Sequence, residues 1–300
     1  MVAAVYVTGR GPELREPTLL QVDTARLEQH QTIKVVDADY GGLEKATTFV
    51  SCGVPGCGIG VRIVDQERGC LMDEDVVGEI WVSGPSKAKG YWGRPELSRE
   101  TFEATISGDA SRTHYLRTGD LGFLHQGELY VCGRLKDLII VQGKNYYPQD
   151  IERAVEASHP GLRPGCSAAF GVEVGGQERL VAVAEVRQEA DSTSYNQLTS
   201  AIRQATMDAG LACHTVLLLR PRSVFKTTSG KIQRSRCKAG YQKWLAHGGR
   251  CVEGGLQVLA ADPPQQHSRS RDASLDRRQY VVRQLLQFLG MLLLPYALAA

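Results

Sequence analysis

The sequence predicts an α+β fold in which a strand-rich first part is followed by a smaller part that mixes strands and helices. Short runs of apolar and β-branched residues, separated by turns that carry Gly or Pro, fill residues 1–135 and indicate a β-rich subdomain. Over residues 136–247, strand-like runs alternate with helical patterns whose apolar residues recur every three to four positions. The 300 residues allow about two domains.

In the first part, short apolar runs predict strands and two segments predict helices. The predicted strands are residues 1–8, 19–22, 47–53, 60–65 and 78–84. One helix is predicted from Asp23, a residue type that caps helix N-termini, to Gln31. A second is predicted over 94–102, with proline near its first turn. The neighbouring Tyr91 and Trp92 are expected to pack inside this subdomain.

A glycine-bearing hairpin follows and carries a charged pair. Thr118-Gly119-Asp120 is predicted as an acidic turn, ahead of two short strands at 121–124 and 128–132. Asp120 and Arg134 are 14 residues apart, so the hairpin can aim both side chains at one ligand. A ribose diol is such a ligand, because a carboxylate accepts from two hydroxyls and a guanidinium donates in a fixed fork. Alternatively, Asp120 only bonds its neighbouring backbone, as in many turns.

The second part reads as a compact α+β domain. Its predicted helices are residues 150–158, 195–209 and 235–247, and its predicted strands are 166–172, 180–186 and 215–219. In the middle helix, Leu198, Ile202 and Met207 are expected to face inward. A sheet covered by helices accounts for the strongly apolar strands.

The composition changes after residue 247. Residues 248–274 are rich in Gly, Pro, Ser, Arg and Gln, which predicts a linker. Residues 275–300 begin as an amphipathic helix and become apolar. Their uncharged run is at the lower limit for crossing a bilayer, so we expect a truncated helix, which could be the start of a carrier domain, and no stable membrane span.

Charge and cysteine usage exclude several classes of function. A net charge of +2 provides no basic surface for nucleic acid or for an anionic membrane, so neither is expected as a partner. The chain contains 42% hydrophobic residues, as ordinary globular proteins do. Its 8 cysteines are scattered. Cys52 and Cys57 flank a Gly-Pro turn and could form half a zinc site, but free thiols in a cytoplasmic protein are the favoured interpretation.

Three stretches, in this order, resemble successive motifs of the adenylate-forming (AMP-binding) enzymes, which include acyl-CoA synthetases, peptide-synthetase adenylation domains and luciferases. They are YLRTGDLG at 115–122, GRLKDLIIVQGKNYYPQDIE at 133–152 and FKTTSGKIQR at 225–234. GEIWVSGPSKAKGYW at 78–92, together with the YPQDIE ending, is similar to the fatty acyl-AMP ligases. Three ordered motifs at family-like separation are a far more specific signal than any one alone.

The resemblance implies roles for four residues. Asp120 and Arg134 would bind the nucleotide, and Lys231, in a loop of small polar residues, would be the catalytic cation. Lys136 would be the hinge between the large AMP-binding domain, to which residues 1–135 belong, and a small mobile lid. The alternatives are that Lys136 is an exposed lysine in a turn and that Lys231 is a solvated lysine near the end of its domain.

The implied reaction is ATP-dependent activation of a fatty acid. The carboxylate attacks the α-phosphate to give acyl-adenylate and pyrophosphate, and the acyl group then passes to the thiol of an acyl carrier protein or of CoA. A positioned lysine stabilises the charge that gathers on the phosphate oxygens in the transition state. Mg²⁺ would accompany ATP, and we assign no metal ligand in this chain. CoA ligases often carry a further lysine where this sequence has Ile140, which favours a carrier-protein thiol.

Two features limit the predicted activity. No Gly/Ser/Thr-rich phosphate loop occurs, and the strand predicted at Met1 resembles one deep inside the large domain, so most ATP contacts would lie upstream. We therefore expect a C-terminal fragment that makes no acyl-AMP by itself. The chain could instead be a non-catalytic remnant that acts as an interaction module, or part of a multidomain polyketide or peptide synthase that works only beside its neighbours.

Overall fold

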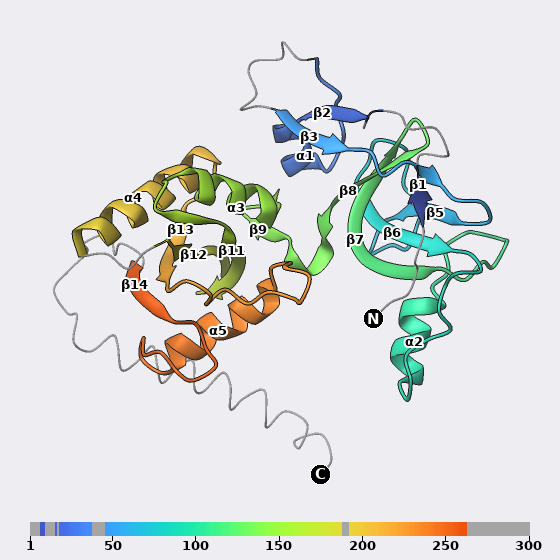
Figure 1. Ribbon diagram of the computed structural model, residues 1–300. Helices are drawn as coiled ribbons and strands as arrows, with labels where there is room; N and C mark the ends of the chain where they lie inside the picture. Colours follow the sequence, from blue (N-terminus) through green and yellow to red (C-terminus); the bar gives the residue numbers. More distant parts are fainter. Residues whose placement is uncertain (1–6, 10–15, 17, 38–45, 188–191, 263–300) are drawn as a thin grey trace. The chain divides into compact units, whose positions relative to one another are not determined.

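Figure 1 presents the computed structural model of the chain, which describes residues 7–9, 16, 18–37, 46–187 and 192–262. The fold is α+β with several separate sheets, as predicted. The predictions for the first six residues, and for the linker and helix beyond residue 262, lie outside the described residues.

The elements up to residue 134 are mostly strands. They are β1 (Thr8–Gly9), β2 (Leu19–Asp23), α1 (Thr24–His30), β3 (Ala46–Val50), β4 (Val54–Pro55), β5 (Gly60–Val64), β6 (Gly78–Ser83), α2 (Pro95–Phe102), β7 (Leu116–His125) and β8 (Glu128–Arg134). The largest sheet here is antiparallel, in the order β5-β6-β7-β8. Smaller two-stranded sheets pair β2 with β3 and β1 with β4. The predicted β-rich subdomain therefore rests on antiparallel pairings, several of which join strands far apart in the sequence.

Helix α1 begins where its capping residue predicts. The Asp23 side chain accepts a hydrogen bond from the Arg26 backbone N–H at 3.0 Å, which satisfies one N–H group that the helix leaves unpaired. The helix ends at Gln31, whose backbone is left-handed with φ +52°. On the inner face, Leu27 is buried together with Val22 of β2.

The turn predicted at Thr118–Asp120 is wrong. The segment lies inside the longer strand β7. Its neighbour β6 pairs Trp81 with Arg117 and Glu79 with Leu121, so β7 uses two more residues than β6 over the same stretch. Such a bulge needs unusual backbone angles, and Gly119 supplies them with φ +71°. The bulge keeps the strand paired while it changes the direction of the side chains beside it.

Two apolar side chains predicted to pack inward are exposed. The Trp92 side chain is fully exposed, although its neighbour Tyr91 packs edge-on against Phe102 with ring centroids 5.1 Å apart. Met207 is 57% exposed, whereas Leu198 and Ile202 of the same helix are buried. Met207 is five positions beyond Ile202, about 500° of rotation, and so leaves the face that Leu198 and Ile202 share.

A short 3-10 turn, η2 (Leu135–Asp137), connects the two parts, and the elements after it build the second domain. They are β9 (Ile139–Val141), β10 (Lys144–Tyr146), α3 (Pro148–Ala157), β11 (Leu162–Val174), β12 (Gln177–Val186), α4 (Ser192–Asp208), β13 (Cys213–Leu219), α5 (Arg234–Ala246) and β14 (Val258–Asp262). The main sheet has the order β11-β12-β13-β14. Only the pairing of β12 with β13 is parallel, and helix α4 makes that crossover.

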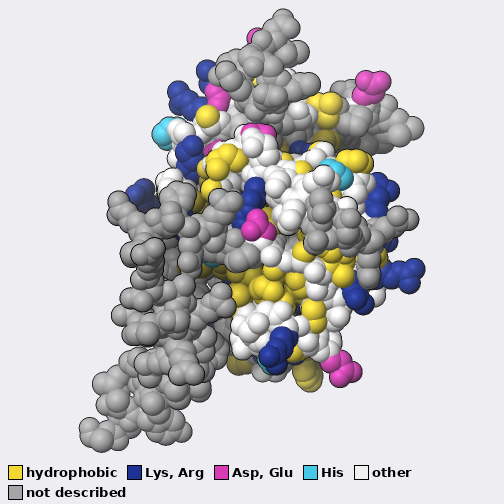
Figure 2. All heavy atoms as spheres, turned by 90° about the vertical axis from the view of Figure 1, so that its left-hand side faces the viewer, with side chains coloured by type: hydrophobic (Ala, Val, Ile, Leu, Met, Phe, Trp, Pro, Cys, Tyr) yellow, Lys and Arg dark blue, Asp and Glu magenta, His cyan; other side chains and the backbone are white. Residues whose placement is uncertain are grey.

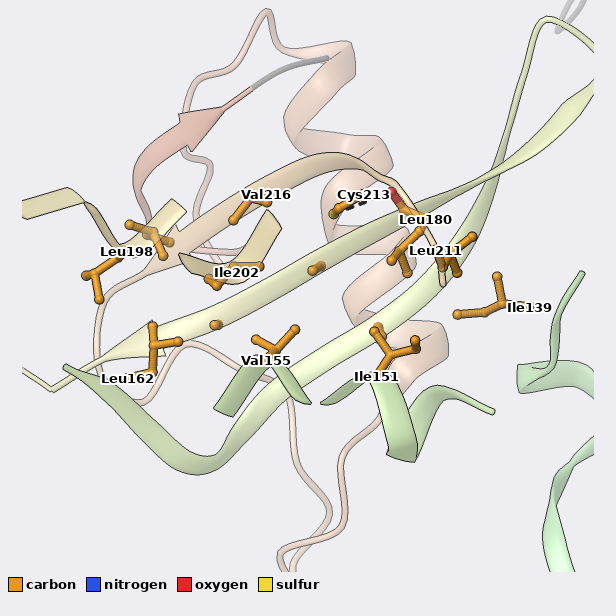
Figure 3. Close-up of a cluster of buried hydrophobic side chains, with 14 of the residues drawn as sticks. Ile139, Ile151, Val155, Leu162, Leu180, Leu198, Ile202, Leu211, Cys213 and Val216 are labelled. Atoms are coloured by element: carbon orange, nitrogen blue, oxygen red, sulfur yellow. Dashed lines mark hydrogen bonds between the residues drawn. The ribbon is translucent and has the colours of Figure 1, made fainter. Parts of the chain in front are cut away.

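Both faces of this sheet are covered by helices, as Figure 1 shows. On one face, Ile151 and Val155 of α3 and Ile202 of α4 pack against strand residues (Figure 3). On the other face, Cys237 and Tyr241 of α5 complete a second buried cluster. Because both faces are buried, the strands are apolar at nearly every position rather than at every second one.

The predicted linker at 248–274 is wrong for its first half. Residues 258–262 form β14, which pairs antiparallel with β13 from Val216 opposite Asp262 to Leu219 opposite Val258. Leu256, just before the strand, is 1% exposed and joins the cluster beneath α5. Composition suggested a linker because several glycines precede a strand of only five residues.

Charged side chains are spread over the face of the molecule that Figure 2 draws. Figure 2 shows Lys and Arg side chains scattered over the visible face, with no single basic patch. Within the described ranges, no helix is long and apolar enough to cross a membrane.

Candidate functional site

Asp120 and Arg134 lie opposite each other on the neighbouring strands β7 and β8. Arg134 Nε donates to Asp120 Oδ1 at 3.1 Å, so the hairpin does place the two side chains together. The Asp120 side chain is 38% exposed and that of Arg134 is 56% exposed. An exposed pair of this kind adds little stability, about 0–1 kcal/mol, and both partners remain available to a ligand.

A buried carboxylate holds the bulge that carries Asp120. Glu79 of β6, only 2% exposed, accepts hydrogen bonds from Arg117 Nε at 3.0 Å and Nη2 at 2.8 Å. Its other oxygen accepts from the Gly119 N–H at 3.1 Å, while Thr118 Oγ1 donates to the Ile80 carbonyl at 2.7 Å. These hydrogen bonds fix the backbone leading into Asp120.

Lys231 lies on a short hairpin between β13 and α5. The hairpin closes through Gln233 N–H to the Phe225 carbonyl at 2.8 Å and through Thr227 N–H to the Lys231 carbonyl at 2.8 Å. The Thr227 hydroxyl accepts from the Lys231 N–H at 3.0 Å. Lys231 itself is exposed, and in the described part of the chain its ammonium makes no ion pair.

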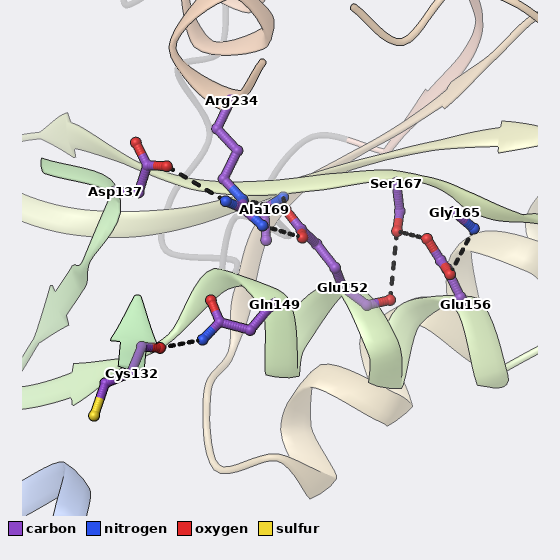
Figure 4. Close-up of polar contacts among 9 residues, drawn as sticks. All are labelled: Cys132, Asp137, Gln149, Glu152, Glu156, Gly165, Ser167, Ala169 and Arg234. Atoms are coloured by element: carbon purple, nitrogen blue, oxygen red, sulfur yellow. Dashed lines mark hydrogen bonds and ion pairs between the residues drawn. The ribbon is translucent and has the colours of Figure 1, made fainter. Parts of the chain in front are cut away.

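The hinge residue proposed from the sequence, Lys136, is exposed in the middle of η2. Its neighbour Asp137 accepts from Arg234 Nη1 at 3.3 Å. Arg234 is the first residue of α5, three positions after Lys231, and also binds the buried Glu152 of α3 (Figure 4). Burial raises the pKa of the Glu152 carboxyl, although Arg234 opposes this, and the pKa of Arg234 is raised chiefly by its hydrogen bond to Glu152.

The structure brings together Asp120 with Arg134, and it presents Lys136 and Lys231 as exposed lysines at separate positions. Sequence reasoning missed the supporting residues Glu79, Glu152 and Arg234. A signal was available for each, because Glu79 interrupts an apolar strand and the other two are the final residues of two motifs. Among the described residues, no group of three or more His, Cys, Asp or Glu side chains could hold a metal ion.

Fold and motifs together define the later part of an AMP-binding enzyme, with a bulged hairpin followed by an α+β domain that carries an exposed lysine. The family model of AMP-binding enzymes matches residues 33–92. The model described as the Disco-interacting protein 2-like AMP domain matches residues 136–247.

Known proteins of this kind match over most of the chain. The medium-chain-fatty-acid–[acyl-carrier-protein] ligase JamA of Moorena producens is 43% identical over 226 residues, which are 74% of this chain and 38% of JamA. The long-chain-fatty-acid–AMP ligase FadD32 of Mycolicibacterium smegmatis is 34% identical, with 80% of this chain and 42% of FadD32 covered. A structure from a study of fatty acyl-adenylate ligases of E. coli and L. pneumophila superposes with a TM-score of 0.67 at 34% identity and covers 81% of this chain and 40% of that one.

The chain therefore belongs to the AMP-binding superfamily, and within it to the proteins that resemble fatty acyl-AMP ligases. It spans about two fifths of the length of these curated relatives, 38% of JamA and 42% of FadD32.

Proposed function

We propose that this chain contributes the ribose-binding hairpin and the lysine-bearing lid to an enzyme that activates a fatty acid with ATP. The observation that carries the proposal is the Asp120–Arg134 pair, a half-exposed carboxylate 3.1 Å from a guanidinium on the next strand. The exposed Lys231 and the relatives named as fatty-acid ligases support it. In this proposal residues 1–135 belong to the large domain, residues 136–247 form the lid that pivots at Lys136, and the protein is cytoplasmic.

In this proposal, three residues of the chain take part in the adenylation reaction: Asp120, Arg134 and Lys231. Asp120 accepts hydrogen bonds from the two ribose hydroxyls, and Arg134 orients Asp120 and donates to ribose oxygen. The fatty acid carboxylate attacks the α-phosphorus of ATP, and the bond to pyrophosphate breaks. The Lys231 ammonium stabilises the charge that develops on the α-phosphate oxygens. Mg²⁺, when bound with ATP, would neutralise phosphate charge, and no step here depends on a metal ligand from the described residues.

For the acceptor of the acyl group, we propose the thiol of a carrier protein rather than of CoA. Ile140 of β9, 49% exposed, lies where CoA ligases often carry a lysine, and an aliphatic side chain offers CoA no charge. JamA, whose name specifies an acyl-carrier-protein ligase, is among the relatives. Transfer assays with a phosphopantetheinylated carrier and with CoA, run side by side on preformed acyl-adenylate, distinguish the two acceptors.

Nucleotide binding by the chain tests the ribose assignment. AMP and 2′,3′-dideoxy-AMP differ only in the diol, and NMR titration detects even weak binding. We expect AMP to bind about tenfold more tightly, because the dideoxy analogue leaves a charged acceptor without its hydroxyl partners. Equal affinity for the two nucleotides would show that the hairpin does not bind the ribose hydroxyls.

Matched variants locate the effect. Asp120→Asn should remove the preference for AMP. Asp75→Asn should keep it, since Asp75 belongs to the same subdomain but pairs with His125 at 2.7 Å. Pyrophosphate release, measured with ATP and a panel of fatty acids, then tests carboxylate activation. Robust turnover by this chain alone would contradict our expectation that it needs further segments.

A further inference from the structure

The guanidinium of Arg234 binds acidic residues of two separate elements, Glu152 of α3 and Asp137 of η2. Its Nε and Nη2 donate to the two oxygens of Glu152 at 2.7 and 2.6 Å, and its Nη1 donates to Asp137 at 3.3 Å (Figure 4). Its side chain is 20% exposed, that of Asp137 is 15% exposed and that of Glu152 is 9% exposed. Charged groups with so little solvent contact hold each other far more strongly than a surface pair does.

Glu152 connects this contact to the core of the domain. The carboxylate oxygen that receives Arg234 Nε also accepts from the Ala169 N–H at 3.0 Å, so α3 is joined to β11 at the same point. Only a planar fork can bind both oxygens of one carboxylate and still reach a second acid, so a lysine could not replace Arg234 here. Arg234 is thereby fixed relative to the central sheet.

The Lys231 hairpin is stiff, and its second strand runs directly into Arg234. Four of its amides, those of Thr227, Gly230, Lys231 and Gln233, are hydrogen-bonded within the hairpin. On the far side of its base, the Arg236 guanidinium stacks over the Phe225 ring at 4.3 Å. Opening of these four hydrogen bonds is therefore limited by what holds the base of the hairpin.

We propose that Arg234 is the positioning residue for Lys231. It ties the base of the lysine hairpin to the lid side of the hinge through Asp137 and to the sheet through Glu152. When the backbone rotates at Lys136, the Lys231 ammonium then moves together with the rest of the second domain and keeps its position within it. This inference rests on the proposed roles of Lys136 and Lys231. It gives Glu152 and Arg234, the final residues of two motifs, the shared role of fixing the Lys231 hairpin to the rest of the domain.

Amide hydrogen exchange of the full chain tests the coupling directly. The four bonded amides of the hairpin report its opening, and the amides of β12 report the stability of the domain. Arg234→Lys keeps the charge but loses the fork, and Asp137→Asn loses one charged acceptor. We expect both variants to accelerate exchange of the hairpin amides, by about tenfold for Arg234→Lys, while the β12 amides stay unchanged.

A double variant and a matched control make the result specific. Asp137→Asn added to Arg234→Lys should give no further acceleration, since the lysine no longer reaches Asp137. The control is Arg203→Lys, which disrupts the ion pair with Asp262 that joins α4 to β14 and whose arginine is 22% exposed, close to the exposure of Arg234; it should leave the hairpin unchanged. A rise shared equally by hairpin and β12, or no rise at all, overturns the proposal.

The exchange measurement is independent of nucleotide. If the chain shows no preference for AMP but Arg234→Lys loosens only the hairpin, the coupling stands and the proposed function fails. If AMP binding behaves as expected but the hairpin amides do not respond, the coupling fails alone.

Discussion

Substitution of Glu79 gives the most informative stability prediction. It tests the residues that hold the site in place, whereas substitution of Asp120 tests the contact with the ligand. Glu79→Gln preserves size and shape but removes the charge that receives two N–H groups of Arg117 and the N–H of Gly119. We expect the variant to fold less stably and to bind nucleotide more weakly, because the bulge before Asp120 loses its anchor. Asp120→Asn should weaken binding only.

The magnitude follows from the burial of the two partners. Breaking a buried ion pair costs about 3–5 kcal/mol, and a hydrogen bond to a charged group contributes about 1.5–3 kcal/mol. Arg117 is 37% exposed, so water takes over part of its solvation and we reduce the expected loss to about 2 kcal/mol. With an m-value of about 3 kcal/mol/M, this lowers the urea midpoint by about 0.7 M.

Urea unfolding followed by the fluorescence of Trp81 measures this loss. Trp81 lies beneath Arg117, with the guanidinium carbon 5.5 Å from the ring centroid, and replacing Trp92 and Trp244 by Phe leaves Trp81 as the sole reporter. Glu67→Gln, at an exposed acid in the loop after β5, is the control and should not shift the midpoint. A shift for Glu79→Gln below about 0.2 M would refute the anchoring role.

Two further predictions concern the second domain. Leu256→Ala should lower the free energy of unfolding by about 2–5 kcal/mol, measured by urea unfolding, because Leu256 is 1% exposed within the cluster beneath α5; a neutral effect would contradict the packing of that segment. His214 has a pKa lowered below 6.5, first by burial and then by Arg179 and Arg203, so the unfolded state binds more protons and stability should fall as pH drops through and below 6.5. In His214→Gln this slope should flatten when unfolding is measured between pH 7 and pH 5, and an unchanged slope would assign it to other groups.

Local patterns in the sequence predicted most of the strands and helices, and long-range contacts decide what they missed. Capping at Asp23 follows from residue type, the inward positions of Leu198 and Ile202 follow from spacing, and the structure agrees with both. The exposure of Trp92 and the turn expected at Thr118–Asp120 could not be judged from neighbours in sequence, because each depends on what packs or pairs beside it.

The candidate site was predictable in its exposed members and unpredictable in its buried ones. Asp120 and Arg134 could be paired from their separation along a hairpin. Glu79 is 38 residues before Arg117, and Glu152 is 82 residues before Arg234, so neither pair follows from local spacing. Glu79 stands out in the sequence as an acid within an apolar strand, but the cation that it binds is known only from the structure.

Strand β14 has a practical consequence for work on the second domain alone. A second domain ended at residue 247, where the family match ends, would lack the segment that covers β13. The backbone N–H and C=O groups along one side of β13 would then be open, beside leucines that are fully buried in the complete domain. Such an uncovered edge is a template for another chain, so the shortened domain should self-associate, whereas one extended through Asp262 keeps β13 paired with its own strand β14.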